Sequence, residues 1–290
     1  MKIQVLFPAS PPLREERYRQ ARATAERELP EITLLHPRLI SARDSNDPLG
    51  YLAGDDALRS SEIVNFLKDP ECAVAWFGRG GYGLTRILSR LEEALGGSRY
   101  PHKRWLGYSD LTALFAFAKA QSLEIQSIHG PMLCAFPEQP NQGDIAAALR
   151  GEPVPIRVHA PQPGLQFQGS IWGGNLAVLA SLCGTPWLPT PASDQAVFLE
   201  DVGEAPYRVD RFLTQLHDSG FFARTRRVFL GTFTEHEPAE HVLRVAQERC
   251  RQLGLQVLGE LPAGHSEPHS PIFLDFPYRY SAENHRLEPA

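Results

Sequence analysis

The sequence predicts an α/β protein built from two domains. The chain has 290 residues, 42% of them hydrophobic, and short apolar runs alternate with amphipathic stretches along most of its length. Strands that alternate with helices imply a parallel sheet with helices on both faces. A chain of this length fills one large domain or two of ordinary size, and we favour two.

The N-terminal part follows this alternation closely. Apolar runs predict its strands and amphipathic periodicity predicts its helices. We expect residues 1–136 to form a Rossmann-like domain with a parallel sheet. In chain order its elements are a strand at 2–7, a helix at 13–29, a strand at 32–35, a polar loop through 44–47, a helix near 53–67, a strand at 73–77, a helix at 84–95, a strand at 105–106 and a helix at 111–119.

The stretch from 136 to 168 is rich in Pro, Gly and Gln and lacks helical periodicity, which predicts a linker at 137–167. Residues 168–290 then predict a second, smaller α/β domain. Its expected strands lie at 168–172, 196–199, 227–233 and 257–259, and its helices at 175–182, 208–219 and 239–253. Sites in such sheets lie at the carboxyl ends of the strands.

Composition excludes several classes of function. The formal net charge is −5 and no dense Lys/Arg cluster is present, which argues against nucleic-acid binding. The first apolar run reaches Pro8 too soon for a signal peptide, and no later run approaches a membrane span, so we expect a cytoplasmic protein without membrane contact. The four cysteines are widely scattered, without C-x-x-C spacing, so we expect neither a disulfide nor a metal site.

Ser109 lies where the apolar run Trp105–Leu106 meets a helix-like pattern. A serine at such a junction is held on a sharp turn with its hydroxyl exposed, and the helix dipole can stabilise negative charge there. This favours a nucleophile. The alternative is a helix N-cap, since serine is preferred there and Asp110 suits a first turn. The motif also lacks the second glycine of G-x-S-x-G, because Leu111 takes its position.

The glycine-rich segment from Gly78 to Gly83 matches G-x-G-x-x-G after a predicted strand. It departs from a dinucleotide fingerprint because it does not follow the first strand and no acidic residue ends a strand about twenty residues later. A second interpretation is that its backbone N–H groups stabilise an oxyanion, which requires chain conformations that side chains forbid. A plain strand-to-helix turn is the third.

Three carboxylates, those of Glu200, Asp201 and Glu204, lie between the strand expected at 196–199 and a helix. A carboxylate at a strand end can orient a histidine and stabilise its charged form. Acidic residues before a helix also serve as simple complements to its N-terminal charge.

His265 is presented by a glycine-bearing loop directly after a predicted strand. A single histidine among ten is more often structural than catalytic. His129 and His269 are similar lone candidates.

Six blocks of sequence, taken in order, resemble the LD-carboxypeptidase family of serine peptidases, which includes murein tetrapeptide carboxypeptidases and microcin C self-immunity peptidases. After the last block the sequence departs from the family pattern, because residues 269–277 replace a Pro-Leu-Gly strand. The blocks span nearly the whole chain: Arg79-Gly-Gly-Tyr-Gly83, Gly107-Tyr-Ser-Asp110, His129-Gly-Pro-Met132, Trp172-Gly-Gly-Asn-Leu176 with Gly184-Thr-Pro186, Leu199-Glu-Asp-Val-Gly-Glu204 running into Pro206-Tyr-Arg-Val-Asp-Arg211, and Gly264-His265.

The resemblance implies a catalytic triad of Ser109 as nucleophile, Glu200 as the residue that orients the histidine, and His265 as general base and acid. Glu204 is the rival acid, and we favour Glu200 because it lies directly at the predicted strand end. The resemblance further implies a homodimer, no cofactor, and an active site in the cleft between the domains. The oxyanion hole would use the backbone N–H groups of Asp110 and Gly81 (or Gly80), and expected substrate contacts are Gly80, Tyr82, Trp172 and Asn175.

The implied activity is release of the terminal D-Ala from cytoplasmic murein tetrapeptide during peptidoglycan recycling. An alternative within the family is a self-immunity peptidase that cleaves the amide between an acidic residue and a sulfamoyl or phosphoramidate adenylate, which needs an aromatic platform for adenine. A third, non-enzymatic alternative is a nucleotide-binding module that uses Gly78 to Gly83 for an NAD-type cofactor.

Overall fold

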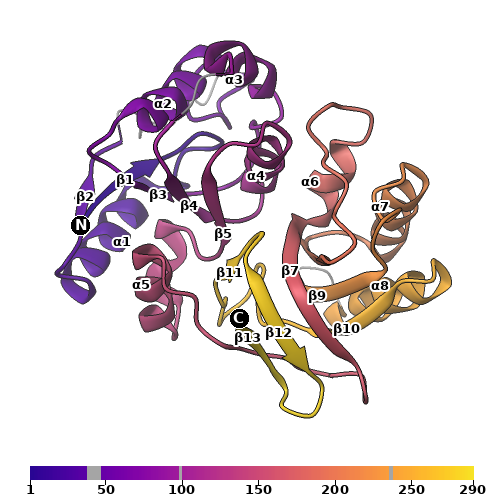
Figure 1. Cartoon of the computed structure of the whole chain (residues 1–290). Helices are drawn as coiled ribbons and strands as arrows, with labels where there is room; N and C mark the ends of the chain where they lie inside the picture. Colours follow the sequence, from indigo (N-terminus) through magenta and orange to yellow (C-terminus); the bar gives the residue numbers. More distant parts are fainter. Residues whose placement is uncertain (38–46, 98–99, 235–237) are drawn as a thin grey trace.

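The computed structural model describes residues 1–37, 47–97, 100–234 and 238–290. Two lobes follow one another along the chain, the first coloured indigo to magenta and the second orange to yellow (Figure 1). Each lobe contains one sheet with a parallel core, so the predicted α/β fold class is confirmed. Most of the expected polar loop at 44–47 lies outside the described residues.

The first sheet has the strand order β11-β5-β4-β3-β1-β2. Its parallel strands all come from the N-terminal part, and every residue of β3 is buried, as expected for a strand covered on both faces. Parallel strands end at the same edge of the sheet, so the segments that follow β3 and β4 meet there. The parallel strands are β1 (Lys2–Leu6), β2 (Thr33–Leu35), β3 (Val74–Phe77), β4 (Lys103–Gly107) and β5 (Ile125–His129).

The helices of the first lobe are α1 (Glu15–Glu28), α2 (Asp56–Lys68), α3 (Leu88–Leu95), α4 (Leu111–Ala120) and α5 (Gln142–Arg150). Helix α1 buries Tyr18, Ala21 and Ala25, whose spacing places them on one helical face. Helix α3 begins at Leu88, not at Leu84 as predicted. The backbone N–H of Leu84 donates to the Asp110 carboxylate at 3.0 Å, and a turn precedes the helix.

Residues 137–167 contain more structure than their composition predicts. Helix α5 packs against β4, and the 3₁₀ helix η1 (Leu133–Glu138), which ends just inside this segment, packs against α1. The buried residues of α5 run consecutively from Ile145 to Leu149 and include three alanines, so they give no helical period in the sequence. The segment ends with β6 (Ile156–Arg157), so it is not an extended connection along its whole length.

The second sheet has the order β10-β9-β8-β7-β12-β13-β6. Its parallel part is formed by β7 (Gln166–Asn175), β8 (Ala196–Val202), β9 (Arg227–Thr234) and β10 (Gln256–Glu260), together with helices α6 (Leu176–Ser181), α7 (Pro206–Asp218) and α8 (Ala239–Gln252). Strands β12 (Pro277–Ser281) and β13 (Arg286–Pro289) continue it in antiparallel fashion beside β7 (Figure 1). Neither is predicted from the sequence, because both are short and expose alternate polar residues.

The two lobes are joined at one edge of the first sheet. Strand β11 (Ile272–Phe273) belongs to the C-terminal segment, yet it pairs antiparallel with β5, so that Ile272 lies opposite His129. Helix α4 also packs against α6 and β7. Within the residues described, no helix is both long enough and apolar enough to cross a membrane.

Candidate active site

Ser109 forms the turn between β4 and α4. Its φ of 64° lies in the left-handed region, which is strained for a residue with a side chain. The helix N-cap position belongs to Asp110, which makes no side-chain cap hydrogen bond. No described residue, not even His265, makes a hydrogen bond to the Ser109 hydroxyl. The serine therefore does not cap the helix, and its hydroxyl is available for chemistry.

The glycine-rich segment faces this turn. A Cβ atom at Gly80 would lie 3.1 Å from Ser109 Oγ, and one at Gly81 would lie 2.2 Å from Ser10 Oγ. Gly81 has a φ of 105°, which side chains rarely adopt. The N–H groups of Gly81 and Asp110 donate to none of the described residues. Glycine is therefore required here by close approach, and two N–H groups beside the serine remain open.

Glu200 lies inside β8, not at its end, because the strand continues to Val202. The register between β8 and β9 shifts between Leu199 and Asp201, an irregularity that changes where the intervening side chain points. Glu200 is 0% exposed, and its Oε2 lies 2.8 Å from His265 Nδ1. Glu200 thus contacts His265 from a point inside the strand where the register shifts, and not from the end of the strand.

His265 reaches Glu200 from the loop after β10. The preceding Gly264 has a φ of 129°, and a Cβ there would lie 2.9 Å from Glu200 Oε2. Thr234 Oγ1 donates to the His265 carbonyl at 3.1 Å, which fixes the backbone of the loop. The imidazole is partly exposed, whereas its carboxylate partner is buried. One ring nitrogen, Nδ1, is thus held by the buried Glu200 carboxylate.

The electrostatics of this pair favour an ionised carboxylate. Burial by itself would raise the pKa of Glu200, but the charge of His265 and the neighbouring His129 outweigh burial and lower that pKa below its ordinary value. His129 Nε2 lies 3.8 Å from the second carboxylate oxygen. Glu200 therefore has an imidazole near each oxygen and can stabilise a positive charge on His265.

Three aromatic rings surround the pair, and the sequence alone did not group them. The Tyr108 ring lies 4.7 Å from those of His265 and His269 and 5.9 Å from that of His129, measured between centroids. His269 Nε2 and His129 Nδ1 are 3.2 Å apart. Burial, and then the charge of His129, lowers the pKa of His269 well below its ordinary value, so His269 is neutral at physiological pH. Tyr108 adjoins Ser109, so this cluster brings the serine turn of one lobe against the histidine of the other.

Two predicted substrate contacts have structural roles. Trp172 is 1% exposed and packs against Phe221 inside the second lobe. Asn175 is buried at the start of α6, where it accepts from the backbone N–H of Val178 and donates to Asp201. Neither side chain faces solvent in this structure, and their contacts with substrate remain predictions. Tyr82 fits its prediction better, because 47% of its surface is exposed beside the glycine-rich segment.

The rival acid, Glu204, is engaged elsewhere. Its Oε2 pairs with Arg208 Nε at 2.5 Å across one turn at the entry to α7. The structure therefore gives Glu204 the role of a helix-entry charge and leaves Glu200 as the carboxylate in contact with a histidine.

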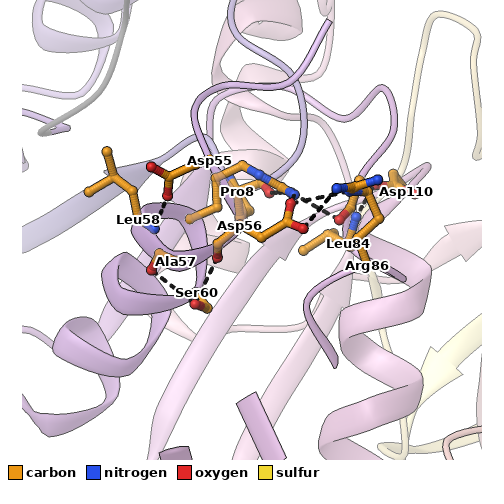
Figure 2. A network of polar contacts seen from close by, with 11 residues as sticks. Pro8, Asp55, Asp56, Ala57, Leu58, Ser60, Leu84, Arg86 and Asp110 are labelled. Carbon is orange, nitrogen blue, oxygen red and sulfur yellow. Dashed lines mark hydrogen bonds and ion pairs between the residues drawn. The ribbon is translucent and has the colours of Figure 1, made fainter. Parts of the chain in front are cut away.

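A polar network around Arg59 contacts the end of the glycine-rich segment, and Figure 2 shows its part around Asp56, Arg86 and Asp110. Arg59 is fully buried and donates to the carbonyls of Pro8 at 2.6 Å and Gly83 at 2.9 Å. Its guanidinium also pairs with Asp56, which Arg86 holds from the other side. Burial raises the pKa of the nearby Asp110 to about 6. The network ties Pro8, just after β1, to Gly83 at the end of the glycine-rich segment.

The same network argues against a dinucleotide site. A phosphate would need free N–H groups at a helix N-terminus directly after the glycines. Helix α3 begins only at Leu88, and the Leu84 N–H already binds the Asp110 carboxylate. A negative carboxylate at that position would repel a pyrophosphate.

A serine on a strained turn between strand and helix, close to a histidine bonded to a buried carboxylate, is the set of groups used by serine hydrolases. Comparison with known proteins agrees. The family model for the LD-carboxypeptidase N-terminal domain matches residues 3–130, and that for the C-terminal domain matches residues 168–279. The chain therefore belongs to the LD-carboxypeptidase family, and the resemblance inferred from the sequence is confirmed.

Individual relatives support the assignment. A murein tetrapeptide carboxypeptidase of Pseudomonas aeruginosa is 30% identical over 233 residues, covering 74% of each chain. A putative carboxypeptidase of a Synechocystis species is 33% identical over 237 residues, covering 78% of this chain and 76% of that protein.

Two solved structures share the fold. The muramoyltetrapeptide carboxypeptidase from Oxalobacter formigenes has a TM-score of 0.76 at 21% identity, with both chains covered completely. The protein MccF in complex with glutamyl sulfamoyl guanosine has a TM-score of 0.79 at 20% identity, covering 100% of this chain and 95% of that one.

Proposed function

We propose that this protein is a serine carboxypeptidase that releases the C-terminal D-Ala from murein tetrapeptide, with Ser109, Glu200 and His265 as its triad. The observation that carries the proposal is the 2.8 Å hydrogen bond between Glu200 and His265, beside a serine turn with a φ of 64°. The relative from Pseudomonas aeruginosa, whose name states this substrate, supports the choice of peptide.

In the proposed reaction, His265 Nε2 takes the proton from Ser109 Oγ as the oxygen attacks the carbonyl before the terminal D-Ala. Glu200 stabilises the resulting imidazolium through Nδ1. The N–H groups of Asp110 and Gly81 face the developing oxyanion. The imidazolium then protonates the leaving amine of D-Ala, and water hydrolyses the acyl-enzyme by the same route. The Ser109–His265 hydrogen bond would form as substrate binds, since such contacts are often loose in free enzymes.

Incubation of the purified protein with murein tetrapeptide, followed by mass spectrometry, tests the reaction. We expect the loss of one alanine residue and the appearance of tripeptide and free D-Ala. A matched tetrapeptide ending in L-Ala should remain intact. If neither peptide is shortened while Ser109 still reacts with a fluorophosphonate probe, the nucleophile is correct and the substrate assignment is wrong.

A second candidate function, cleavage of an aminoacyl sulfamoyl adenosine, is favoured by one observation. Tyr51 and Tyr82 are each 47% exposed and their ring centroids lie 5.9 Å apart beside the glycine-rich segment, a surface on which a purine could stack. The same mass-spectrometric assay with aspartyl sulfamoyl adenosine separates the two functions. Faster release of sulfamoyl adenosine than of D-Ala would favour this candidate.

The oxyanion loop is expected to depend on Arg59. Arg59→Met leaves two buried carbonyls without a donor, at a cost of about 1–3 kcal/mol each, and should also lower kcat because Gly83 is no longer fixed. Lys103→Met is the matched control. Lys103 is a second buried cation that donates to two carbonyls, but it lies at the start of β4, the end of the strand opposite to Ser109. This variant should destabilise the fold with kcat unchanged. Thermal unfolding and steady-state kinetics measure both, and an equal loss of kcat in the two variants would contradict the role of Arg59.

The cellular setting belongs to the same proposal. A cytoplasmic location, participation in peptidoglycan recycling and a homodimeric state remain predictions, and sedimentation of the purified protein measures the last. No cofactor takes part in the proposed reaction.

A further inference from the structure

A cavity of about 300 Å³ opens beside the triad histidine. His265 and Tyr108 form its wall on the catalytic side, Met132 adds apolar surface, and Arg17 and Arg79 supply two positive charges. None of the described residues that line it is an aspartate or a glutamate. The cavity is therefore small, partly apolar and positively charged, which suits a short aliphatic group carrying a carboxylate.

The two arginines differ in their partners. Arg17 pairs with Glu138 at 3.1 Å, so its charge is already compensated. Arg79 is half-buried and donates through Nη1 to the Pro11 carbonyl at 2.8 Å, and no carboxylate among the described residues pairs with it. Burial lowers the pKa of Arg79, as expected for a cation that has lost water without gaining an anion. Its remaining donors are open to a ligand.

The place of Arg79 relative to the reacting atoms follows from the chain. Arg79 immediately precedes Gly80, whose Cβ position lies 3.1 Å from Ser109 Oγ. His265 must deliver a proton to the leaving amine, so the leaving amino acid lies on the side of the imidazole. That side is the cavity that His265 and Arg79 share. The carboxylate of the leaving residue is only two bonds from its amine, so it enters the same space.

We propose that Arg79 binds the C-terminal carboxylate of the substrate in this cavity, and so restricts cleavage to the last residue of a peptide. The proposal rests on the proposed carboxypeptidase function. A planar guanidinium offers two parallel donors to a carboxylate, which fixes both its position and its orientation. A peptide that continues beyond D-Ala, or ends in an amide, offers no negative charge to Arg79.

Paired substrates test this inference. Murein tetrapeptide with a free C-terminus and the same peptide as its C-terminal amide are compared in the wild type, Arg79→Gln and Arg79→Lys. We expect the wild type to prefer the acid, and Arg79→Gln to lower kcat/KM for the acid by about 10- to 100-fold with little change for the amide. Arg79→Lys should retain part of the preference for the free acid over the amide. It provides the test if Arg79→Gln does not fold. Arg17→Gln is the matched control and should keep the full preference.

Binding separates this inference from the proposed function. Calorimetry with the Ser109→Ala protein measures the affinity for the acid and the amide without turnover. If the acid binds more tightly than the amide but the wild type hydrolyses neither, the proposed reaction is wrong, whereas recognition of the C-terminal carboxylate stands. If both peptides bind equally, or if Arg79→Gln keeps the preference for the acid, the role of Arg79 is overturned.

Discussion

Replacing Ser109 with alanine is expected to reduce kcat/KM for murein tetrapeptide by about 10⁴-fold or more, because the reaction loses its nucleophile. The fold should be retained. The Ser109 hydroxyl hydrogen-bonds to none of the described residues, so its removal should change the free energy of unfolding by no more than about 0.5 kcal/mol. Mass-spectrometric kinetics and thermal unfolding measure the two effects.

Ser122→Ala is a matched control for this prediction. Ser122 also has a positive φ, 52°, and lies just beyond the opposite end of α4, away from His265. Its alanine variant should retain wild-type activity. Near-normal turnover by Ser109→Ala would refute the nucleophile, and loss of activity in both variants would point to strain in the two turns instead.

Replacing Glu200 with glutamine should lower kcat by about 10³- to 10⁴-fold with little change in KM. Glutamine keeps the shape of the side chain but carries no charge to stabilise the imidazolium of His265, and its amide can hold the ring in the wrong tautomer. Steady-state kinetics measure the separate effects on kcat and KM. An active Glu200→Gln protein would exclude this residue from the triad.

Glu204→Gln is the control four residues away. It removes only a pair with the partly exposed Arg208, worth about 0.3–0.5 kcal/mol, so activity should be unchanged. If Glu204→Gln were inactive and Glu200→Gln active, the geometry described here would not be that of the working enzyme.

The lowered pKa of Glu200 adds a measurement that does not depend on turnover. A carboxyl whose pKa is lower in the folded than in the unfolded state contributes stability above its ordinary pKa of 4.5, and this contribution is lost as the pH falls toward the folded value. The wild type should therefore lose more stability than Glu200→Gln as the pH falls below 4.5. Equal losses would show that Glu200 is not held ionised by its histidines.

Local patterns predicted much of this protein from sequence. The alternation of apolar runs and amphipathic stretches determined most strands and helices, because those signals extend over five to fifteen neighbouring residues. Ser109, Gly80 and His265 could be selected as candidates because strand-to-helix turns and glycine loops mark the carboxyl edge of a parallel sheet. The strand β11 escaped because two residues cannot repeat a pattern, and the helix α5 escaped because its buried residues are consecutive and mostly alanine, without a helical period.

Tertiary structure decided which candidates meet. Glu200 and His265 are 65 positions apart, and His129 and His269 are 140 apart, so no local pattern could pair them. Glu200, and not Glu204, lies where the register between β8 and β9 shifts, and this shift exists only once the two strands are paired. The sequence by itself therefore determined the elements and the reactive residue types, whereas the packing of the two lobes determined their partners, because burial, charge and hydrogen bonding depend on neighbours in space.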